Sequence, residues 1–409
     1  MKKIWIFNHY AEPPQYETRV RNNAMTKYLM AAGYDVTIFG ASTIHNTDIN
    51  LITDGSPFIR REYDGLKFVH INVPGYSGNG LSRKLNLLAF PYRLWKYTKK
   101  IDEKPDLIIN DLDVMAFHFP FAIAKRYRCP IITEVRDLWP ESIIAYGMLK
   151  RESLLARFLY AVERYMYIQS TAIVFSMENG YEYIRNKGWE RVVPIEKVHY
   201  VNNGVDLPLF LENRARFQVK DPDLDAKDTF KVVYTGSVRR VNNLGLLLDT
   251  AKQVKDPTVR FLIWGDGDEW DALRQRAEAE NISNVIFKGR VDKAYVPSIV
   301  SQADLNIAHN TPSSLFAYGI SFNKLFDYLA AGKPILSDFP SAHNPAVLWN
   351  AGTEVREPTA ENIARAIEAF VHMDKQTYDN YSRNAAAAAK AYSFEELTKK
   401  LLVIIEKLL

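Results

Sequence analysis

The chain has 409 residues, of which 47% are hydrophobic and 24% are charged, and its formal net charge is +4. These values are typical of a globular protein with two or three domains, and they exclude disordered, collagen-like and disulfide-stapled classes. Its single cysteine, Cys129, has no partner for an internal disulfide and leaves no cysteine set for zinc, so we expect a cytoplasmic protein. The charge is too small to predict nucleic acid as a partner.

The first residues form a short apolar run, Ile4 to Phe7, which Asn8 and His9 interrupt before the core of a signal peptide could form. We therefore interpret this run as a first buried strand. No uninterrupted apolar stretch approaches the ~20 residues of a membrane-spanning helix, so we expect no span.

Short apolar, β-branched runs then alternate with longer helical patterns, which is typical of parallel sheets flanked by helices. A turn motif and a polar segment with a proline interrupt this alternation between Asn202 and Thr229. We therefore predict an α/β protein with two Rossmann-like, doubly wound domains, residues 1–204 and 205–409. Either domain could accept the last amphipathic helix, 394–409. The predicted strands are Ile4–Phe7, Val36–Phe39, Phe68–Ile71, Leu107–Ile109, Ile131–Glu134, Ala172–Phe175, Val198–Val201, Val232–Tyr234, Phe261–Ile263, Val285–Phe287, Leu305–Ala308 and Ile335–Ser337.

The motifs of common cofactors are missing from the sequence. The loop after the first strand contains no glycine, which argues against a nicotinamide or flavin there, and no P-loop motif occurs. The segment Gly265-Asp266-Gly267 reads as a strand-to-helix turn. The pair Asp111 and Asp113 is too short a motif to predict a metal, and the eight histidines are scattered, so we expect neither metal nor cofactor.

A bound diphosphate would then be neutralised by side-chain cations and helix N-termini. Gly236 forms a turn after a strand and is followed by Arg239 and Arg240. Lys324 lies at a predicted helix start, and Asp327 follows one turn later, where its carboxylate could meet ribose hydroxyls. Each residue alone is more typical of a solvent-facing charge, and only the combination indicates an anion site.

Four segments give the chain a family resemblance: 13–19, 134–142, 201–206, and 323–328 together with 331–334. Through them it resembles the GT-B glycosyltransferases of family 4, which are retaining enzymes that use a nucleotide-sugar donor without a metal. The segment 134–142 is similar to transferases of amino-deoxysugars that build O-antigen and capsular polysaccharide. The resemblance implies a GT-B fold, in which an N-terminal acceptor domain and a C-terminal donor domain face each other across a cleft.

The resemblance also implies site residues. We expect Arg136 and Asp137 at the catalytic centre, with Asp137 orienting the acceptor; the alternative is a structural ion pair between them. Two pairs of family residues differ in this chain: the paired glutamates fall on Gly319 and Asp327, and the diphosphate-binding pair falls on Ser237 and Asn242. The expected acceptor-side residues are Tyr16, Glu17 and Arg19, and the expected donor-binding residues are Gly236, Arg239, Arg240, Arg290, Tyr318, Gly319, Asn323, Lys324 and Asp327.

The segment Leu81 to Lys100 carries six basic residues and no acid, interleaved with leucines and aromatic residues. This pattern predicts contact with an anionic membrane surface, unless the segment is an ordinary helix with its lysines in water, and Pro91 could divide it. We therefore expect a peripheral protein on the inner face of the cell membrane, with a sugar on a polyprenyl diphosphate as the acceptor.

Three functions remain open from the sequence. The first is a retaining transferase that moves an N-acetylated hexosamine or deoxy-hexosamine from a UDP-sugar to a lipid-linked oligosaccharide in O-antigen or capsule synthesis. The second is a UDP-sugar 2-epimerase of the same fold. The third is a non-catalytic protein that binds nucleotide sugars or glycans.

Overall fold

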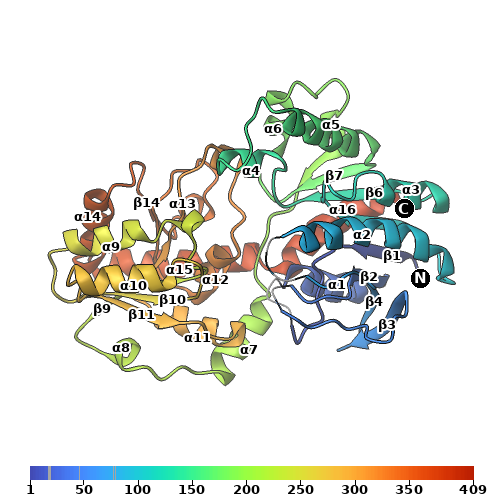
Figure 1. Cartoon of the computed structure of the whole chain (residues 1–409). Helices are drawn as coiled ribbons and strands as arrows, with labels where there is room; N and C mark the ends of the chain where they lie inside the picture. The colour runs from blue at the N-terminus through green and yellow to red at the C-terminus, as the bar shows by residue number, and fades with distance from the viewer. Residues whose placement is uncertain (17–19, 46, 77, 79) are drawn as a thin grey trace. The chain divides into compact units, whose positions relative to one another are not determined.

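The computed structural model describes residues 1–16, 20–45, 47–76, 78 and 80–409 (Figure 1). These residues form two compact units. The first unit combines residues 1–202 with the last helix, residues 394–409, and the second unit is the continuous stretch 203–393.

An eight-stranded sheet organises the first unit, in the order β3-β4-β2-β1-β5-β6-β7-β8. Neighbouring strands are parallel except for β3, which is antiparallel to β4. The parallel strands are largely buried, because helices cover both faces of such a sheet. The strands are β1 (Lys3–Phe7), β2 (Asp35–Ala41), β3 (Phe58–Tyr63), β4 (Leu66–Ile71), β5 (Leu107–Asp111), β6 (Ile131–Val135), β7 (Ala172–Phe175) and β8 (Val198–Tyr200).

Helices of the first unit pack in pairs beside this sheet. The C-terminal helix α16 (Phe394–Leu408), drawn red, lies beside the blue α1 (Arg21–Ala31) (Figure 1). Buried residues of α16, among them Leu397, Leu401 and Ile405, recur at helical spacing. The other helices are α2 (Leu81–Tyr97), which packs against α3 (Phe119–Tyr127), and α4 (Glu141–Ala145), α5 (Leu154–Gln169) and α6 (Gly180–Asn186).

A six-stranded sheet organises the second unit, in the order β11-β10-β9-β12-β13-β14, with all neighbouring pairs parallel. Alternate residues of its central strand enter different clusters of the core: Val232 and Tyr234 join one, and Val233 joins another. The strands are β9 (Phe230–Thr235), β10 (Val259–Trp264), β11 (Val285–Gly289), β12 (Leu305–Ala308), β13 (Ile335–Ser337) and β14 (Gly352–Glu354).

In the second unit, α9 packs against α14, and α12 packs against both α15 and α11. The helices of this unit are α7 (Leu207–Arg216), α8 (Pro222–Asp225), α9 (Gly245–Gln253), α10 (Trp270–Ala279), α11 (Val296–Ser301), α12 (Asn323–Ala331), α13 (Pro345–Leu348), α14 (Ala360–Val371) and α15 (Lys375–Ala391).

The predicted fold class is confirmed, since both sheets are of the parallel α/β type. Two strands were missed. The edge strand β3 reads Phe-Ile-Arg-Arg-Glu-Tyr and is largely exposed, and β14 has only three residues. Neither strand contains the buried apolar run on which the prediction relied. No helix within the described ranges is both long and apolar enough to cross a bilayer.

Candidate functional site

The carboxyl ends of β9 and β10 bring two glycine turns into direct contact. Gly236 has a φ of 154°, and its N–H donates to the carbonyl of Trp264 at 3.0 Å. A Cβ atom on Gly265 would lie 1.7 Å from the carbonyl oxygen of Gly236, so only glycine fits there. The backbone at the end of β9 is thereby fixed where the loop to Arg239 and Arg240 begins.

Lys324 lies in the first turn of α12, close to the end of β9. Its Nζ donates to the hydroxyl of Tyr234 at 3.2 Å and to the carbonyl of His309 at 3.0 Å, and it lies over the Tyr234 ring. Both acceptors are neutral, and no carboxylate among the described residues forms an ion pair with it. Burial lowers the pKa of Lys324 to about 8, although Asp338 acts in the opposite direction.

Lys324 is therefore a cation held beside a helix N-terminus without an acidic partner. The four N–H groups that begin a helix have no partner within it, and they favour an anion. A diphosphate oxygen is the type of ligand that would compensate both the ammonium and these donors.

Two other predicted donor residues already have partners. Asp327 forms an ion pair with Lys293 through one carboxylate oxygen, and its expected contact with a ribose stays a prediction. Asn323 accepts a hydrogen bond from the side chain of Asn203.

Arg239, Arg240 and Arg290 are exposed. Arg239 and Arg240 lie on the loop between β9 and α9, and Arg290 follows the end of β11. None of the three guanidinium groups makes a hydrogen bond or ion pair with the residues that the structure describes. They are cations available at the same carboxyl edge of the sheet as Lys324, although the structure gives no contact between them and Lys324.

Sequence reasoning missed a buried pair, His309 and Asp338. This pair holds the loop between β9 and α9 that carries Arg239 and Arg240, here called the arginine loop. The Nδ1 of His309 contacts the carboxylate of Asp338, and its Nε2 lies 2.9 Å from the carbonyl of Asn243. Thr311 donates to the carbonyl of Val241 at 2.7 Å. The arginine loop is thus attached to the end of β12 at two points.

The sequence contained a usable indication of this pair. His309 directly follows β12, and Asp338 directly follows β13, which is the parallel neighbour of β12. Residues that follow adjacent parallel strands meet at the same sheet edge.

Tyr318 and Gly319 lie between β12 and α12. Tyr318 ends a short 3-10 helix, Ser314–Tyr318, and is half-buried. Gly319 is buried with a φ of 128°, a conformation that a glutamate at this position would not readily adopt. The family's first glutamate is therefore replaced at a position whose backbone conformation favours glycine.

In the first unit, Arg136 belongs to a buried ion-pair network. Its guanidinium donates to Glu134 Oε2 at 2.6 Å and to the side chain of Asn22 at 2.6 Å, and lies 3.5 Å from Asp111. Arg21 donates to the other oxygen of Glu134 at 2.6 Å. Burial by itself raises the pKa of Glu134, but the two arginines lower it to about 2.

Arg136 thus has Glu134 and Asp111 as ion-pair partners at the end of β6, and the catalytic role expected for it stays a prediction. Asp137, the next residue, is exposed. Asp111 is the last residue of β5, and Asp113 lies two positions beyond it. Burial raises the pKa of Asp111 to about 7 and that of Asp113 to about 6. The role expected for Asp137 stays a prediction.

The acceptor-side residues are described only in part. Tyr16 is half-buried in a turn, where its N–H donates to the carbonyl of Pro13 at 2.9 Å. Glu17 and Arg19 lie outside the described residues. Within the described ranges, no group of three or more histidine, cysteine, aspartate or glutamate side chains could hold a metal ion.

The basic segment forms a helix, α2, that continues through Pro91. Its buried residues are Asn86, Phe90, Pro91 and Leu94. Its most exposed apolar residues repeat at intervals of three or four positions and so form one row along the helix: Leu81, Leu85, Leu88 and Tyr92.

Comparisons with known proteins match both units. A Glycosyl transferase 4-like domain matches residues 18–204, and the Glycosyl transferases group 1 domain matches residues 229–372. WbjE of Pseudomonas aeruginosa, named as a glycosyltransferase, is 23% identical over 80% of each chain. TuaH of Bacillus subtilis, named for a glycosyltransferase role in teichuronic acid biosynthesis, is 26% identical over 52% of this chain. That match spans about half the length of TuaH, 51%.

Solved structures share the fold over the whole chain. Sucrose-phosphate synthase from Thermosynechococcus elongatus superimposes with a TM-score of 0.73 at 16% identity, covering 100% of this chain and 99% of that one. HepE of Anabaena, solved in complex with UDP, gives a TM-score of 0.69 at 12% identity, with complete coverage of both chains. At these identities, the likeness shows the fold alone.

Proposed function

The chain belongs to the GT-B glycosyltransferases of family 4, and from this we propose that it transfers a sugar, with retention of configuration, from a UDP-sugar to a lipid-linked oligosaccharide. The donor sugar in this proposal is an N-acetylated hexosamine or deoxy-hexosamine. The product would serve surface polysaccharide synthesis, such as that of O-antigen or capsule, which agrees with the teichuronic acid biosynthesis for which the relative TuaH is named.

The main structural support for this proposal is the environment of Lys324. Its ammonium lies at the start of α12 and has only neutral hydrogen-bond partners. Keeping a partly buried cation in this state costs free energy, which a bound anion would offset. Arg239 and Arg240, exposed on the neighbouring loop, would neutralise the rest of the diphosphate.

In the proposed reaction, the bond between the anomeric carbon and the diphosphate oxygen breaks. A new bond forms to the acceptor hydroxyl on the same face, and the departing phosphate oxygen takes the hydroxyl proton. The chain would contribute positioning and charge stabilisation in this scheme, with Lys324 facing the developing negative charge. Asp137, exposed at the end of β6, would orient the acceptor hydroxyl.

A lipid-linked acceptor places the protein at a membrane surface, and we propose a peripheral position on the cytoplasmic face. The exposed row on α2 supports this, because its leucines alternate with basic residues. A second exposed apolar group, Leu154, Leu155 and Phe158, begins α5. Basic Arg157 lies among these residues in the sequence.

Measuring UDP release separates this proposal from its two alternatives. A transferase releases UDP from the correct UDP-sugar only when a polyprenyl-diphosphate-linked sugar is present. A 2-epimerase converts or hydrolyses the UDP-sugar without any acceptor. A binding protein retains the nucleotide sugar and releases no UDP with any acceptor. A thermal-shift screen of UDP-sugars would first select the donor to be used.

A further inference from the structure

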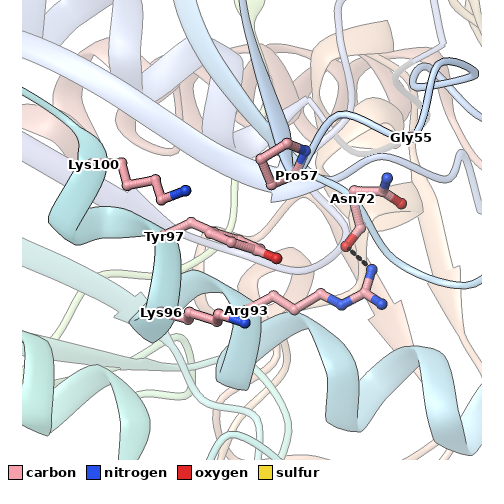
Figure 2. Close-up of a pocket in the computed structure, with 7 residues that line it drawn as sticks. All are labelled: Gly55, Pro57, Asn72, Arg93, Lys96, Tyr97 and Lys100. Carbon is pink, nitrogen blue, oxygen red and sulfur yellow. Dashed lines mark hydrogen bonds between the residues drawn. The ribbon is translucent and has the colours of Figure 1, made fainter.

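A hollow of about 430 Å³ opens in the first unit beside the C-terminal end of α2 (Figure 2). The residues that line it come from α2, from the 3-10 turn Thr98–Lys100, from the loop before β3 and from the segment after β4. Three of them are basic, and none of the described lining residues is acidic. They are Gly55, Pro57, Asn72, Arg93, Lys96, Tyr97 and Lys100.

The three cations are held by contacts that leave donors free. One terminal nitrogen of Arg93 donates to the carbonyl of Asn72 at 2.6 Å, and the other guanidinium N–H groups have no partner among the described residues (Figure 2). The ammonium groups of Lys96 and Lys100 lie 5.5 Å and 5.8 Å from the centre of the Tyr97 ring. None of the three forms an ion pair with a described residue.

The acidic residue next to this hollow in the chain does not neutralise it. Asp54 precedes the lining residue Gly55, but its carboxylate accepts hydrogen bonds from the N–H and hydroxyl of Ser56. Hydrogen bonds from Ser56 lower the pKa of Asp54, so it stays an anion engaged in its own turn. The concentration of positive charge in the hollow is therefore left without a counterion from the lining residues.

We propose that this hollow is a binding site for a phosphate group, held by Arg93, Lys96 and Lys100. A phosphate offers several acceptor oxygens to a planar guanidinium and two ammonium groups, and such charge-assisted hydrogen bonds are stronger than neutral ones. Tyr97 and Asn72 add polar groups at the wall of the site.

The phosphate could belong to a lipid headgroup or be free in solution, and the position of the hollow favours the headgroup. Lys96 continues the exposed row of α2, four positions after Tyr92. A helix lying on a bilayer along this row would bring Lys96 to headgroup depth. This headgroup source rests on the membrane association in the proposed function, whereas the phosphate site itself does not.

A double variant, K96A/K100A, tests the site against the matched control K84A/K99A. Both variants remove two exposed lysines from the same segment, but Lys84 and Lys99 do not line the hollow. Binding is measured by sedimentation with vesicles containing 30% phosphatidylglycerol, with pure phosphatidylcholine vesicles as the blank. Calorimetry with inorganic phosphate and pyrophosphate, without lipid, forms the second arm.

We expect K96A/K100A to weaken binding about tenfold or more, and K84A/K99A by about threefold or less. A selective loss on vesicles alone identifies a headgroup, and a selective loss of phosphate or pyrophosphate binding identifies a free phosphate; both outcomes support the site. Equal losses for the two variants in both arms, or no binding of either ligand, would overturn it.

No sugar donor is present in these assays, so they do not depend on transferase activity. Circular dichroism melts confirm that both variants are folded, and calorimetry with UDP should give the wild-type affinity for each.

Discussion

The ammonium of Lys324 has neutral partners on the chain, so its removal tests the donor site at the scale of one residue. We predict that Lys324→Ala weakens UDP binding by about 2 kcal/mol, or roughly 30-fold in Kd, as expected for the loss of a hydrogen bond to a charged group. Titration calorimetry measures this directly. Lys252→Ala serves as the control, since that lysine is paired with Glu280 on the surface of the same unit. An unchanged UDP affinity in Lys324→Ala would remove Lys324 from the site.

The lowered pKa of Lys324 also predicts how UDP binding depends on pH. With a pKa of about 8, the ammonium of the unbound protein loses its proton as the pH rises through 8. The diphosphate favours the charged lysine, so we expect UDP affinity to fall between pH 7.5 and about 9. Arginine keeps its charge throughout this range, so Lys324→Arg should bind UDP with a flatter pH profile. Parallel pH profiles for the wild type and this variant would show that another group titrates.

The lowered pKa of Lys324 also makes the free energy of unfolding depend on pH. The sign of this dependence follows from the number of protons that the folded and unfolded states bind. The unfolded chain holds this proton up to about pH 10.5, the usual value for lysine, whereas the folded chain releases it near pH 8. Between these values the unfolded state binds more protons, so this lysine increases stability as the pH rises. Burying the charged form is a cost, fully present below pH 8, that ligand binding would offset.

Individual residues also show where prediction from sequence ends. The position of Lys324 at a helix start could be predicted, because helix boundaries follow local patterns. The Asp327–Lys293 and Asn323–Asn203 contacts could not, because they join residues 34 and 120 positions apart. Such pairings depend on tertiary packing.

At the scale of elements, the network at the end of β6 joins a strand to a helix. Arg21 of α1 and Arg136 share the carboxylate of Glu134, and Arg21 also donates to the carbonyls of Val201 and Asn202 at 3.1 Å and 2.6 Å. This one cluster therefore connects α1, β6 and the segment that leaves the first unit. We infer that it stabilises the carboxyl edge on which Asp137 lies.

We predict that Glu134→Gln destabilises the chain by about 3 kcal/mol at pH 7, because two arginines would lose a buried partner. The pKa of Glu134, about 2 in the fold against a usual 4.5, means that its contribution is complete above pH 4.5. It is lost as the pH falls toward 2. Urea unfolding at pH 7 and pH 3.5 checks both statements. The difference in the free energy of unfolding between wild type and variant should be smaller at pH 3.5.

Glu103→Gln is the matched control for this prediction. Glu103 pairs with Lys3 and Arg60, but all three side chains are partly exposed, so its loss should cost less than about 1 kcal/mol. Equal effects of the two substitutions would mean that burial does not strengthen the Glu134 network.

Elements differed in how well the sequence predicted them. Buried parallel strands such as β5 and β10 contain a continuous run of three or more apolar residues and were predicted. The edge strand β3 is mostly polar, because solvent reaches it, and was missed. Pro91 suggested a break in α2, but the helix continues through it, with Pro91 buried against the unit. Tertiary packing compensates there for the lost hydrogen bond.

At the scale of the whole molecule, the chain combines two parallel-sheet units, each with polar residues at the carboxyl edge of its sheet. The second unit offers cations for a diphosphate, and the first offers carboxylates and a basic, apolar helix. The fold class and the family could be predicted from local motifs spread along the chain. The sugars of donor and acceptor could not, because their hydroxyls are recognised by contacts that no local pattern specifies.

The most direct test of the central claim is the transfer of label from a UDP-sugar to a lipid-linked acceptor. A radiolabelled UDP-sugar, chosen by thermal shift, is incubated with the full chain and a polyprenyl-diphosphate-linked sugar, and the products are partitioned between water and butanol. We expect label in the butanol phase, at least tenfold less with Lys324→Ala, and a product anomer that matches the donor. Label that stays in the aqueous phase with every UDP-sugar that binds, or a product of inverted configuration, would contradict the central claim.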